Sequence, residues 1–241
     1  MTVGRRAMVL AAGLGTRMRP ITERIPKPLV EVAGKTLLDR GLDHLAEAGV
    51  ETAVVNVHHL GDQIVRHVAS RSRPLVTISD ETDGLLDSAG GIVRALPLLG
   101  EEPFFLLNAD TFWIDADGSN LDRLRLAWDG ARMDILLMLA RLESTTGHSG
   151  GGDFSLGPQG SLARAKGDPG ALVYAGAGLV DPRVFADVEP GRRSLNVDFD
   201  RAIAAGRLHG MVMNGHWITV GTPDAIPLAE AAIARVGADG R

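Results

Sequence analysis

A segment rich in small residues follows the first apolar run and has the composition of an anion-binding loop. Residues 10–20 read Leu-Ala-Ala-Gly-Leu-Gly-Thr-Arg-Met-Arg-Pro. The small side chains at positions 11, 12, 13 and 15 let a ligand approach the backbone, whose N–H groups can then bind a phosphate. Arg17 adds a planar guanidinium that suits phosphate oxygens. The alternative is a tight glycine turn between a strand and a helix, with Arg17 in solvent.

A lysine stands between two prolines a few residues later, in Pro26-Lys27-Pro28. Prolines fix φ and lack a backbone N–H, so they stiffen the segment that presents the Lys27 ammonium. Together with the small-residue loop, this spacing favours a phosphate site over a plain turn.

Two familiar phosphate-binding motifs do not fit this region. The dinucleotide fingerprint requires a third glycine at position 18, where the chain has Met18. The P-loop requires a glycine five residues before Gly34-Lys35-Thr36, where Leu29 stands. These mismatches argue against a dehydrogenase and against an ordinary ATPase.

A carboxylate follows the apolar run 104–107, in the sequence Asn108-Ala109-Asp110. A hard oxygen ligand at the end of a buried strand suits Mg²⁺. The alternative is a turn aspartate that accepts hydrogen bonds from its own backbone.

The elements that must position these residues alternate between strands and helices through the first 140 residues. Four-to-six-residue apolar runs predict strands, and apolar residues three or four apart predict helices. Thr36 is expected to cap one helix, whose inward face is Leu38, Leu42 and Leu45, and Gly49 to end it. The predicted strands are 7–10, 52–57, 75–79, 104–107 and 134–139, and the later helices are a segment with Leu60, Ile64 and Val68 on one face, 88–95 ending before Pro97, and 121–128.

This alternation predicts an α/β fold with a single doubly wound, mostly parallel, Rossmann-like sheet and helices on both faces. Ligands of such sheets bind beyond the carboxyl ends of the strands. The later part of the chain predicts loops with a hairpin over 144–170, strands near 172–180 and 208–213, a helix near 197–205, and a closing helix with Ile226, Ala229 and Ile233 on one face. We expect one domain over 1–241, with halves of about 1–140 and 141–241.

Composition excludes several classes of protein. The chain has 25 basic and 30 acidic residues, a net charge of −5, which argues against a nucleic-acid binder. Because cysteine is absent, the chain has no disulfide, thiolate metal site or cysteine nucleophile. The apolar run 7–12 is too short for a secretory signal, and no stretch reaches the length of a membrane span. We expect a cytoplasmic protein, monomeric or a small homo-oligomer, without nucleic-acid or membrane partners.

The pattern L-A-A-G-x-G-T-R-M-x-P-x-T-x-x-x-P-K-P-L, from Leu10 to Leu29, resembles the signature of the sugar-1-phosphate nucleotidyltransferases. The resemblance implies a nucleoside triphosphate and a sugar 1-phosphate as substrates, and Mg²⁺ as cofactor. It assigns Arg17 to the leaving phosphates, Lys27 to the reacting centre and Asp110 to the metal. The nucleotide-binding residues that it implies in the loop are Leu10, Ala11, Ala12, Gly13, Gly15, Thr16 and Arg17.

The segment Gly215-His-Trp-Ile-Thr219-Val-Gly-Thr resembles the W-x-D-x-G-T segment of the same family. The family's aspartate there supplies the second metal ligand, and Thr219 replaces it here. Three interpretations stay open. Mg²⁺ relies on Asp110, the triphosphate and water; another acid, from among Asp198, Asp200 and Asp224, substitutes; or the protein is catalytically weak.

The resemblance also implies where the base and the sugar bind. Glu81, Ala89, Gly90 and Gly91 are its base and ribose candidates, and a helix start capped by Ser88 is the structural alternative. Its sugar-side candidates are Asn108, Asp153, Gly176 and Asn196, for which surface turns are the alternative.

Within the family, the short chain is most similar to the N-acetylmuramate 1-phosphate uridylyltransferases of cell-wall recycling. The alternatives are mannose-1-phosphate guanylyltransferases and glucose-1-phosphate thymidylyl- or uridylyltransferases. A nucleotide-sugar sensor or non-catalytic subunit is the non-enzyme alternative, and Thr219 is the reason to consider it. Retention of Arg17, Lys27 and Asp110 together favours an enzyme.

Overall fold

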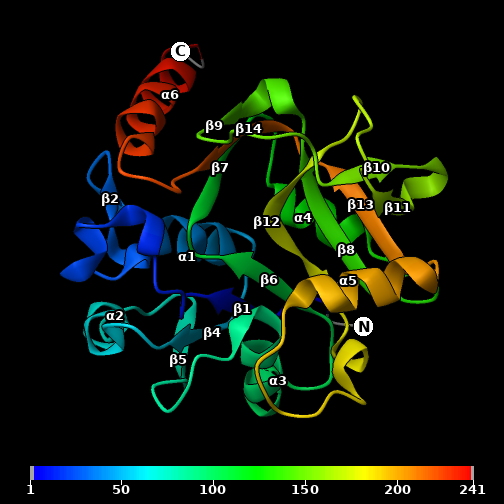
Figure 1. Cartoon of the computed structure of the whole chain (residues 1–241), viewed down its shortest axis with the longest axis horizontal. Helices are drawn as coiled ribbons and strands as arrows, with labels where there is room; N and C mark the ends of the chain where they lie inside the picture. The colour runs from blue at the N-terminus through cyan, green and yellow to red at the C-terminus, as the bar shows by residue number, and fades with distance from the viewer. Residues whose placement is uncertain (1–2, 240–241) are drawn as a thin grey trace.

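A seven-stranded sheet forms the centre of the computed structural model, which describes residues 3–239 (Figure 1). All strands run parallel to β1 except β12, which is antiparallel to both of its neighbours, β6 and β8. The prediction of a mostly parallel sheet is therefore confirmed. In spatial order the strands are β13 (Leu208–Val212), β8 (Ile135–Ala140), β12 (Val173–Val180), β6 (Phe104–Asn108), β1 (Arg6–Leu10), β4 (Thr52–Val57) and β5 (Leu75–Asp80).

Helices cover both faces of this sheet, as predicted, and each face has its own apolar core. One face packs against α1 (Leu37–Glu47), α2 (Gly61–Val68) and α4 (Asn120–Ala127). The other packs against α3 (Asp87–Leu99) and α5 (Leu195–Ala204). Because successive side chains of a strand point to opposite faces of the sheet, strands such as β6 and β8 contribute residues to both cores.

Helix ends follow the expected chemistry at α1 and depart from it at two other places. The Thr36 hydroxyl accepts a hydrogen bond from Asp39 N at 3.0 Å, which confirms the cap. Leu60 precedes α2 with a left-handed φ of 53° rather than lying on its face. The prediction that α3 ends before Pro97 is wrong, because the proline lies in the last turn and burial of Leu99 holds that turn in place.

A three-stranded sheet beside the main one was not predicted. It consists of β7 (Thr111–Asp115), β14 (Gly215–Thr219) and β9 (Thr145–Thr146). With the hairpin β2 (Glu31–Val32) and β3 (Lys35–Thr36), it packs against the closing helix α6 (Ala225–Asp239) around a third apolar cluster. The expected hairpin is β10 (Phe154–Leu156) and β11 (Leu162–Arg164). The short 3-10 helices are η1 (Thr16–Met18), η2 (Ile21–Glu23), η3 (Lys27–Leu29), η4 (Leu142–Ser144), η5 (Pro158–Gly160) and η6 (Pro182–Phe185).

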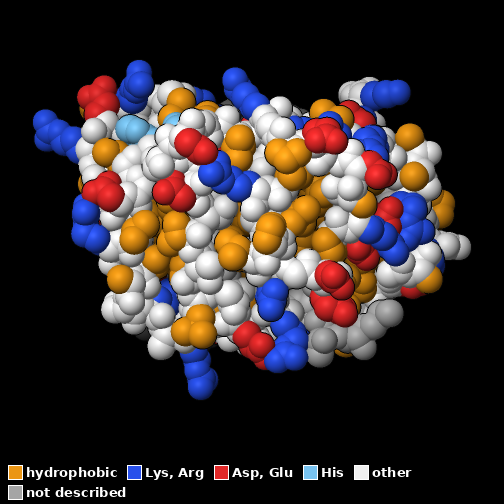
Figure 2. Space-filling view, turned by 90° about the horizontal axis from the view of Figure 1, so that it is seen from below, with side chains coloured by type: hydrophobic (Ala, Val, Ile, Leu, Met, Phe, Trp, Pro, Cys, Tyr) orange, Lys and Arg blue, Asp and Glu red, His pale blue; other side chains and the backbone are white. Residues whose placement is uncertain are grey.

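The surface carries charges of both signs. On the face that Figure 2 shows, basic and acidic side chains are interspersed, with apolar side chains between them. Among the helices of residues 3–239, none combines the length and apolar character needed to cross a bilayer.

Two histidines of the second half make stability depend on pH. Burial lowers the pKa of His209, which is 5% exposed, and also that of His216, whose Nε2 lies 2.8 Å from Thr146 Oγ1. As pH falls below about 6.5, the unfolded chain therefore binds protons that the folded chain does not, and stability decreases. We expect thermal unfolding temperatures to fall between pH 7 and pH 5, and the slope to diminish in the double variant His209→Asn, His216→Asn. An unchanged slope in that variant would assign the dependence to other groups.

Candidate active site

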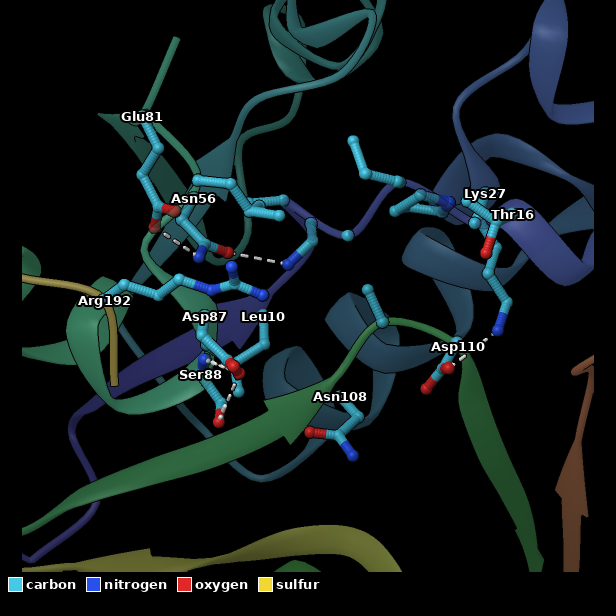
Figure 3. A pocket seen from close by; sticks show the side chains of 18 residues that line it. Leu10, Thr16, Lys27, Asn56, Glu81, Asp87, Ser88, Asn108, Asp110 and Arg192 are labelled. Carbon is cyan, nitrogen blue, oxygen red and sulfur yellow. Dashed lines mark hydrogen bonds and ion pairs between the residues drawn. The ribbon is translucent and has the colours of Figure 1, made fainter. Parts of the chain in front are cut away.

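A cavity of about 460 Å³ lies beyond the carboxyl ends of β1, β4 and β6, where a parallel sheet is expected to bind ligands (Figure 3). Segments far apart in the sequence meet there. The predicted site residues that line it are Leu10, Ala11, Ala12, Gly13, Gly15, Thr16, Lys27, Glu81, Asn108 and Asp110.

The small-residue loop presents unpaired donors to this cavity. Among the described residues, no protein group accepts a hydrogen bond from the backbone N–H groups of residues 12–15. Gly15 has a left-handed φ of 61°, and a Cβ at this position would lie 2.9 Å from Thr22 Cγ2. Thr22 also fixes the loop, because its hydroxyl donates to Gly15 O at 2.8 Å. The loop is thus held by its neighbours while its own N–H groups have no acceptor among the described residues, as an anion site requires.

Lys27 and Asp110 meet at one end of the cavity. Lys27 Nζ donates to Asp110 Oδ2 at 2.7 Å, and Figure 3 shows the two side chains pointing toward each other. The lysine side chain is 10% exposed and the aspartate 37%. Val220 N donates to Asp110 O at 3.2 Å, which ties this residue to the end of β14. The result is a half-buried charge pair with one face open to a ligand.

Arg17 and Thr219 lie near this pair without lining the cavity. A Cβ on Gly221 would be 3.6 Å from Arg17 Nη1, so the exposed Arg17 lies beside the segment that follows β14. Thr219 pairs with Thr111, the neighbour of Asp110 in the chain. Directly opposite residues of an antiparallel pair share a face, so Thr219 lies on the same face as Thr111, whose hydroxyl donates to Ala175 O.

The sugar-side candidates are distributed more widely. Gly176 adjoins Asn108, since a Cβ on Gly176 would lie 3.2 Å from Asn108 Cβ. Asp153 accepts a hydrogen bond from Tyr174 N at 2.8 Å. Asn196 is exposed and its Oδ1 accepts from Arg164 at 3.1 Å. Of this set, Asn108 lines the cavity and Gly176 borders it, whereas the structure does not bring Asp153 and Asn196 into its lining.

The base-side candidates Ala89 and Gly90 lie under a segment of the second half. Both N–H groups donate to Arg193 O, at 2.9 and 3.1 Å. We call residues 189–194, which cross the start of α3, the strap. The strap covers these two residues, so neither lines the cavity.

Sequence reasoning missed several cavity residues. Arg192, carried by the strap, extends into the cavity in Figure 3. Asp87 has a left-handed φ of 63°, a strained conformation that recurs at ligand sites. Asn56 was detectable as a polar residue within the otherwise apolar strand 52–57. The sequence gives no sign that Arg192 lines the cavity, because the position of this residue depends on how the strap folds back over α3. The lining residues missed by sequence reasoning are Leu14, Pro28, Asn56, Leu85, Asp87, Ser88, Ala109 and Arg192.

Burial shifts the acidity of two groups near the cavity. Glu81 is 0% exposed, and burial raises the pKa of its carboxyl. Burial, followed by the nearby charges of Asp110 and Asp153, also raises the pKa of Tyr174. Both groups therefore resist ionisation more than they would in water.

The carboxylate of Asp110, beside Lys27, suits a magnesium ion whose remaining ligands come from substrate and water. Asp110 accepts no other side-chain hydrogen bond within residues 3–239, so its second oxygen is open. Mg²⁺ commonly binds through one or two carboxylates together with substrate phosphates and water. Among residues 3–239, no group of three or more histidine and acidic side chains has an arrangement that could hold a metal ion. Arg193 and Arg164 already engage Asp198 and Asp200.

Known proteins match this chain over nearly its whole length. A family model described as a MobA-like NTP transferase domain matches residues 7–146. An N-acetylmuramate alpha-1-phosphate uridylyltransferase of Caulobacter vibrioides is 47% identical over 95% of this chain and 96% of its own length. One from Neisseria meningitidis is 35% identical over 94% and 97%. The fold is similar to that of HddC from Yersinia pseudotuberculosis in complex with GMP-PN, with a TM-score of 0.77, 21% identity and coverage of 95% and 99%.

Proposed function

Since this chain belongs to the sugar-1-phosphate nucleotidyltransferases, we propose that it condenses UTP with N-acetylmuramate 1-phosphate to form the UDP-sugar and pyrophosphate. The observation that carries the reaction is the cavity that holds a loop of open backbone donors at the end occupied by Lys27 and Asp110. The choice of substrates rests on 47% identity to the Caulobacter uridylyltransferase over 95% of the chain.

The reaction requires the protein to position two phosphates and to neutralise charge. A phosphate oxygen of the sugar 1-phosphate attacks the α-phosphorus of UTP, the new O–P bond forms, and the bond to the β-phosphate oxygen breaks as pyrophosphate leaves. Backbone N–H groups of residues 12–15 bind the triphosphate, and Lys27 binds oxygens at the reacting phosphorus. Arg17, beside Gly221, binds the leaving phosphates. Such preorganised groups lower the barrier because they need no reorientation as charge moves.

A divalent cation completes the site in this proposal. Asp110 would hold Mg²⁺, which when bound would neutralise phosphate charge at the reacting centre. Lys27 would exchange its ion pair with Asp110 for the phosphate of the substrate.

The two halves divide recognition between them in this proposal. The first half binds the nucleotide, with the uracil at the end formed by Glu81, Asn56 and Leu85. The sugar binds where the halves meet, near Asn108 of the first half and Gly176 of the second, with Asp153 and Asn196 of the second half as outer candidates. Asp87 and Arg192 also line the cavity, and in this proposal they contact the ribose.

A carboxylate at position 219 is expected to strengthen metal binding. Thr219 precedes Val220, whose N–H donates to Asp110 O, so Thr219→Asp adds a charged oxygen ligand close to Asp110 in place of a neutral hydroxyl. We expect Mn²⁺ to bind the nucleotide-free variant roughly tenfold more tightly than the parent, because affinity rises with ligand charge. A direct Mn²⁺ titration measures this, with Ser70→Asp at an exposed position as the control. Identical titrations of parent and variant would show that position 219 does not contribute to a metal site.

Pyrophosphate release tests the proposed function directly. The assay combines UTP, GTP, dTTP, CTP and ATP, each with N-acetylmuramate, N-acetylglucosamine, glucose and mannose 1-phosphates, in the presence of Mg²⁺. The proposal expects UTP with N-acetylmuramate 1-phosphate to give the highest kcat/KM. A preference for GTP with mannose 1-phosphate would show that the proposed substrates are wrong. If no pair released pyrophosphate but the protein still bound nucleotide, a sensor would be favoured.

A further inference from the structure

A buried polar pair lies behind the loop that the reaction uses. Asn56 is 2% exposed and Glu81 is 0% exposed. Asn56 Nδ2 donates to Glu81 Oε1 at 2.6 Å, and Asn56 Oδ1 accepts from Ala11 N at 2.7 Å. Figure 3 shows the side chains of Asn56 and Glu81 pointing toward each other.

Donor and acceptor roles in this line are fixed. Ala11 N–H can only donate, so the amide oxygen of Asn56 must face it and the amide NH₂ must face Glu81. Glu81 therefore has to accept, and its second oxygen lies 3.4 Å from another donor, Leu86 N. A carboxyl group meets both demands with lone pairs on each oxygen, whereas an amide at position 81 cannot.

The surrounding backbone is built around the pair. A Cβ on Gly91 would lie 2.5 Å from Glu81 Oε1 and 2.7 Å from Asn56 Nδ2. The backbone of α3 can therefore lie this close to the pair only because residue 91 is a glycine. Glu81 is held further by its own backbone, since Glu81 N donates to Val57 O at 2.8 Å. Unpaired polar groups at such depth would cost folding free energy, so the complete pairing is a strong constraint on local geometry.

We propose that Asn56 and Glu81 are positioning residues, which orient the phosphate-binding loop by fixing the Ala11 peptide. This inference rests on the proposed function. Ala11 is the residue before the open N–H groups of residues 12–15, so the bond to Asn56 anchors the start of that segment. Glu81 acts through Asn56 and does not read the base, because it is fully buried and both of its oxygens face protein donors.

Kinetic behaviour separates positioning from base reading. Asn56→Ala and Glu81→Gln should each weaken binding of UTP and of CTP by the same factor, about tenfold, the scale of one lost hydrogen bond to a charged or backbone group. The kcat at saturating substrates should change less than KM. Direct reading would instead alter the ratio of the two affinities, because N3 is a donor in uracil and an acceptor in cytosine.

A reciprocal exchange provides the matched variant. In Asn56→Asp, Glu81→Gln, the aspartate accepts from Ala11 N and from the glutamine NH₂, and the glutamine oxygen accepts from Leu86 N. All of the hydrogen bonds are thereby kept with the two side-chain types exchanged. The double variant should recover nucleotide affinity to within about threefold of the parent, whereas the single variants Asn56→Asp and Glu81→Gln remain weak.

Hydrogen exchange of the Ala11 amide gives a readout without nucleotide. It should be protected in the parent and in the double variant, and exchange at least tenfold faster in Asn56→Ala. A parent that binds no nucleotide but protects this amide would overturn the proposed function and leave the Asn56 contact intact. An unchanged Ala11 exchange rate in Asn56→Ala, a shifted UTP-to-CTP ratio in Glu81→Gln, or a double variant as weak as the singles would each overturn the positioning role.

Discussion

Lys27→Met and Asp110→Asn are each expected to reduce kcat at least ~10²-fold, the scale of losing one preorganised electrostatic group at a reacting centre. Lys27 Nζ and Asp110 Oδ2 are 2.7 Å apart at the end of the cavity, so both charges lie where phosphate charge would develop. Methionine keeps the length of the lysine stem against Gly15 and removes its charge. Steady-state turnover with UTP and N-acetylmuramate 1-phosphate measures the loss.

Matched variants distinguish a catalytic effect from a general one. Lys35 pairs with Asp43 on the surface, and Asp62 pairs with Arg66 on α2. Neither residue lines the cavity, so Lys35→Met and Asp62→Asn remove the same charges outside it. Both controls should retain parental turnover. Asp110 is 37% exposed, so its carboxylate stays solvated without Lys27 and the fold should persist. Turnover within threefold of the parent in Lys27→Met would refute the assignment.

Gly90→Ala is expected to destabilise the protein by about 1–3 kcal/mol, the range for forcing an extra group into a packed site. A Cβ on Gly90 would lie 2.2 Å from Gly191 O and 3.3 Å from Arg193 N. Glycine-to-alanine changes inside helices usually stabilise by 0.5–1 kcal/mol, roughly, so the predicted sign is opposite to that of the intrinsic propensity. The strap must move away from α3 to admit the methyl group.

Displacement of the strap should also weaken nucleotide binding, because the strap carries Arg192 into the cavity. Chemical denaturation and UTP titration measure the two effects in the same samples. Gly84→Ala is the control, since a Cβ there meets nothing within 4 Å. Unimpaired stability in Gly90→Ala would show that the strap is loosely held, and Arg192→Ala with parental UTP affinity would remove the arginine from the site.

The sequence was sufficient for most of the main sheet because its strands are short and rich in apolar residues. The runs 52–57 and 104–107 have the length and composition expected of buried strands, and Thr36 and Gly49 indicated both ends of α1. The three-stranded sheet was missed because β9 has only two residues and because β14, although as long as β1 and β6, has neither a continuous apolar run nor strict alternation.

The parts of the site that lie next to a recognisable strand or helix in the sequence were predictable. The loop, Lys27 and Asp110 each follow or precede a recognisable element, so their meeting follows from parallel topology. The positions of Arg192 and of the backbone that lies over Gly90 both depend on the strap, which packs on α3 although it is about a hundred residues further along the chain. Such contacts are set by tertiary packing and leave no periodic signal in the chain. Asn56 was predictable in part: the sequence shows a polar residue in this strand, but not its hydrogen bonds to Ala11 and Glu81.

The antiparallel strand β12 also has a consequence for partial chains and for synthesis on the ribosome. It is the link between β6 and β8, so a fragment that ends at residue 146, where the family match ends, contains β8 with no strand beside it. Such a fragment would present the open edges of β6 and β8, both rich in apolar residues, and exposed edges of this kind promote intermolecular pairing. The nascent chain is therefore expected to join β8 to the rest of the sheet only after residue 180 has emerged.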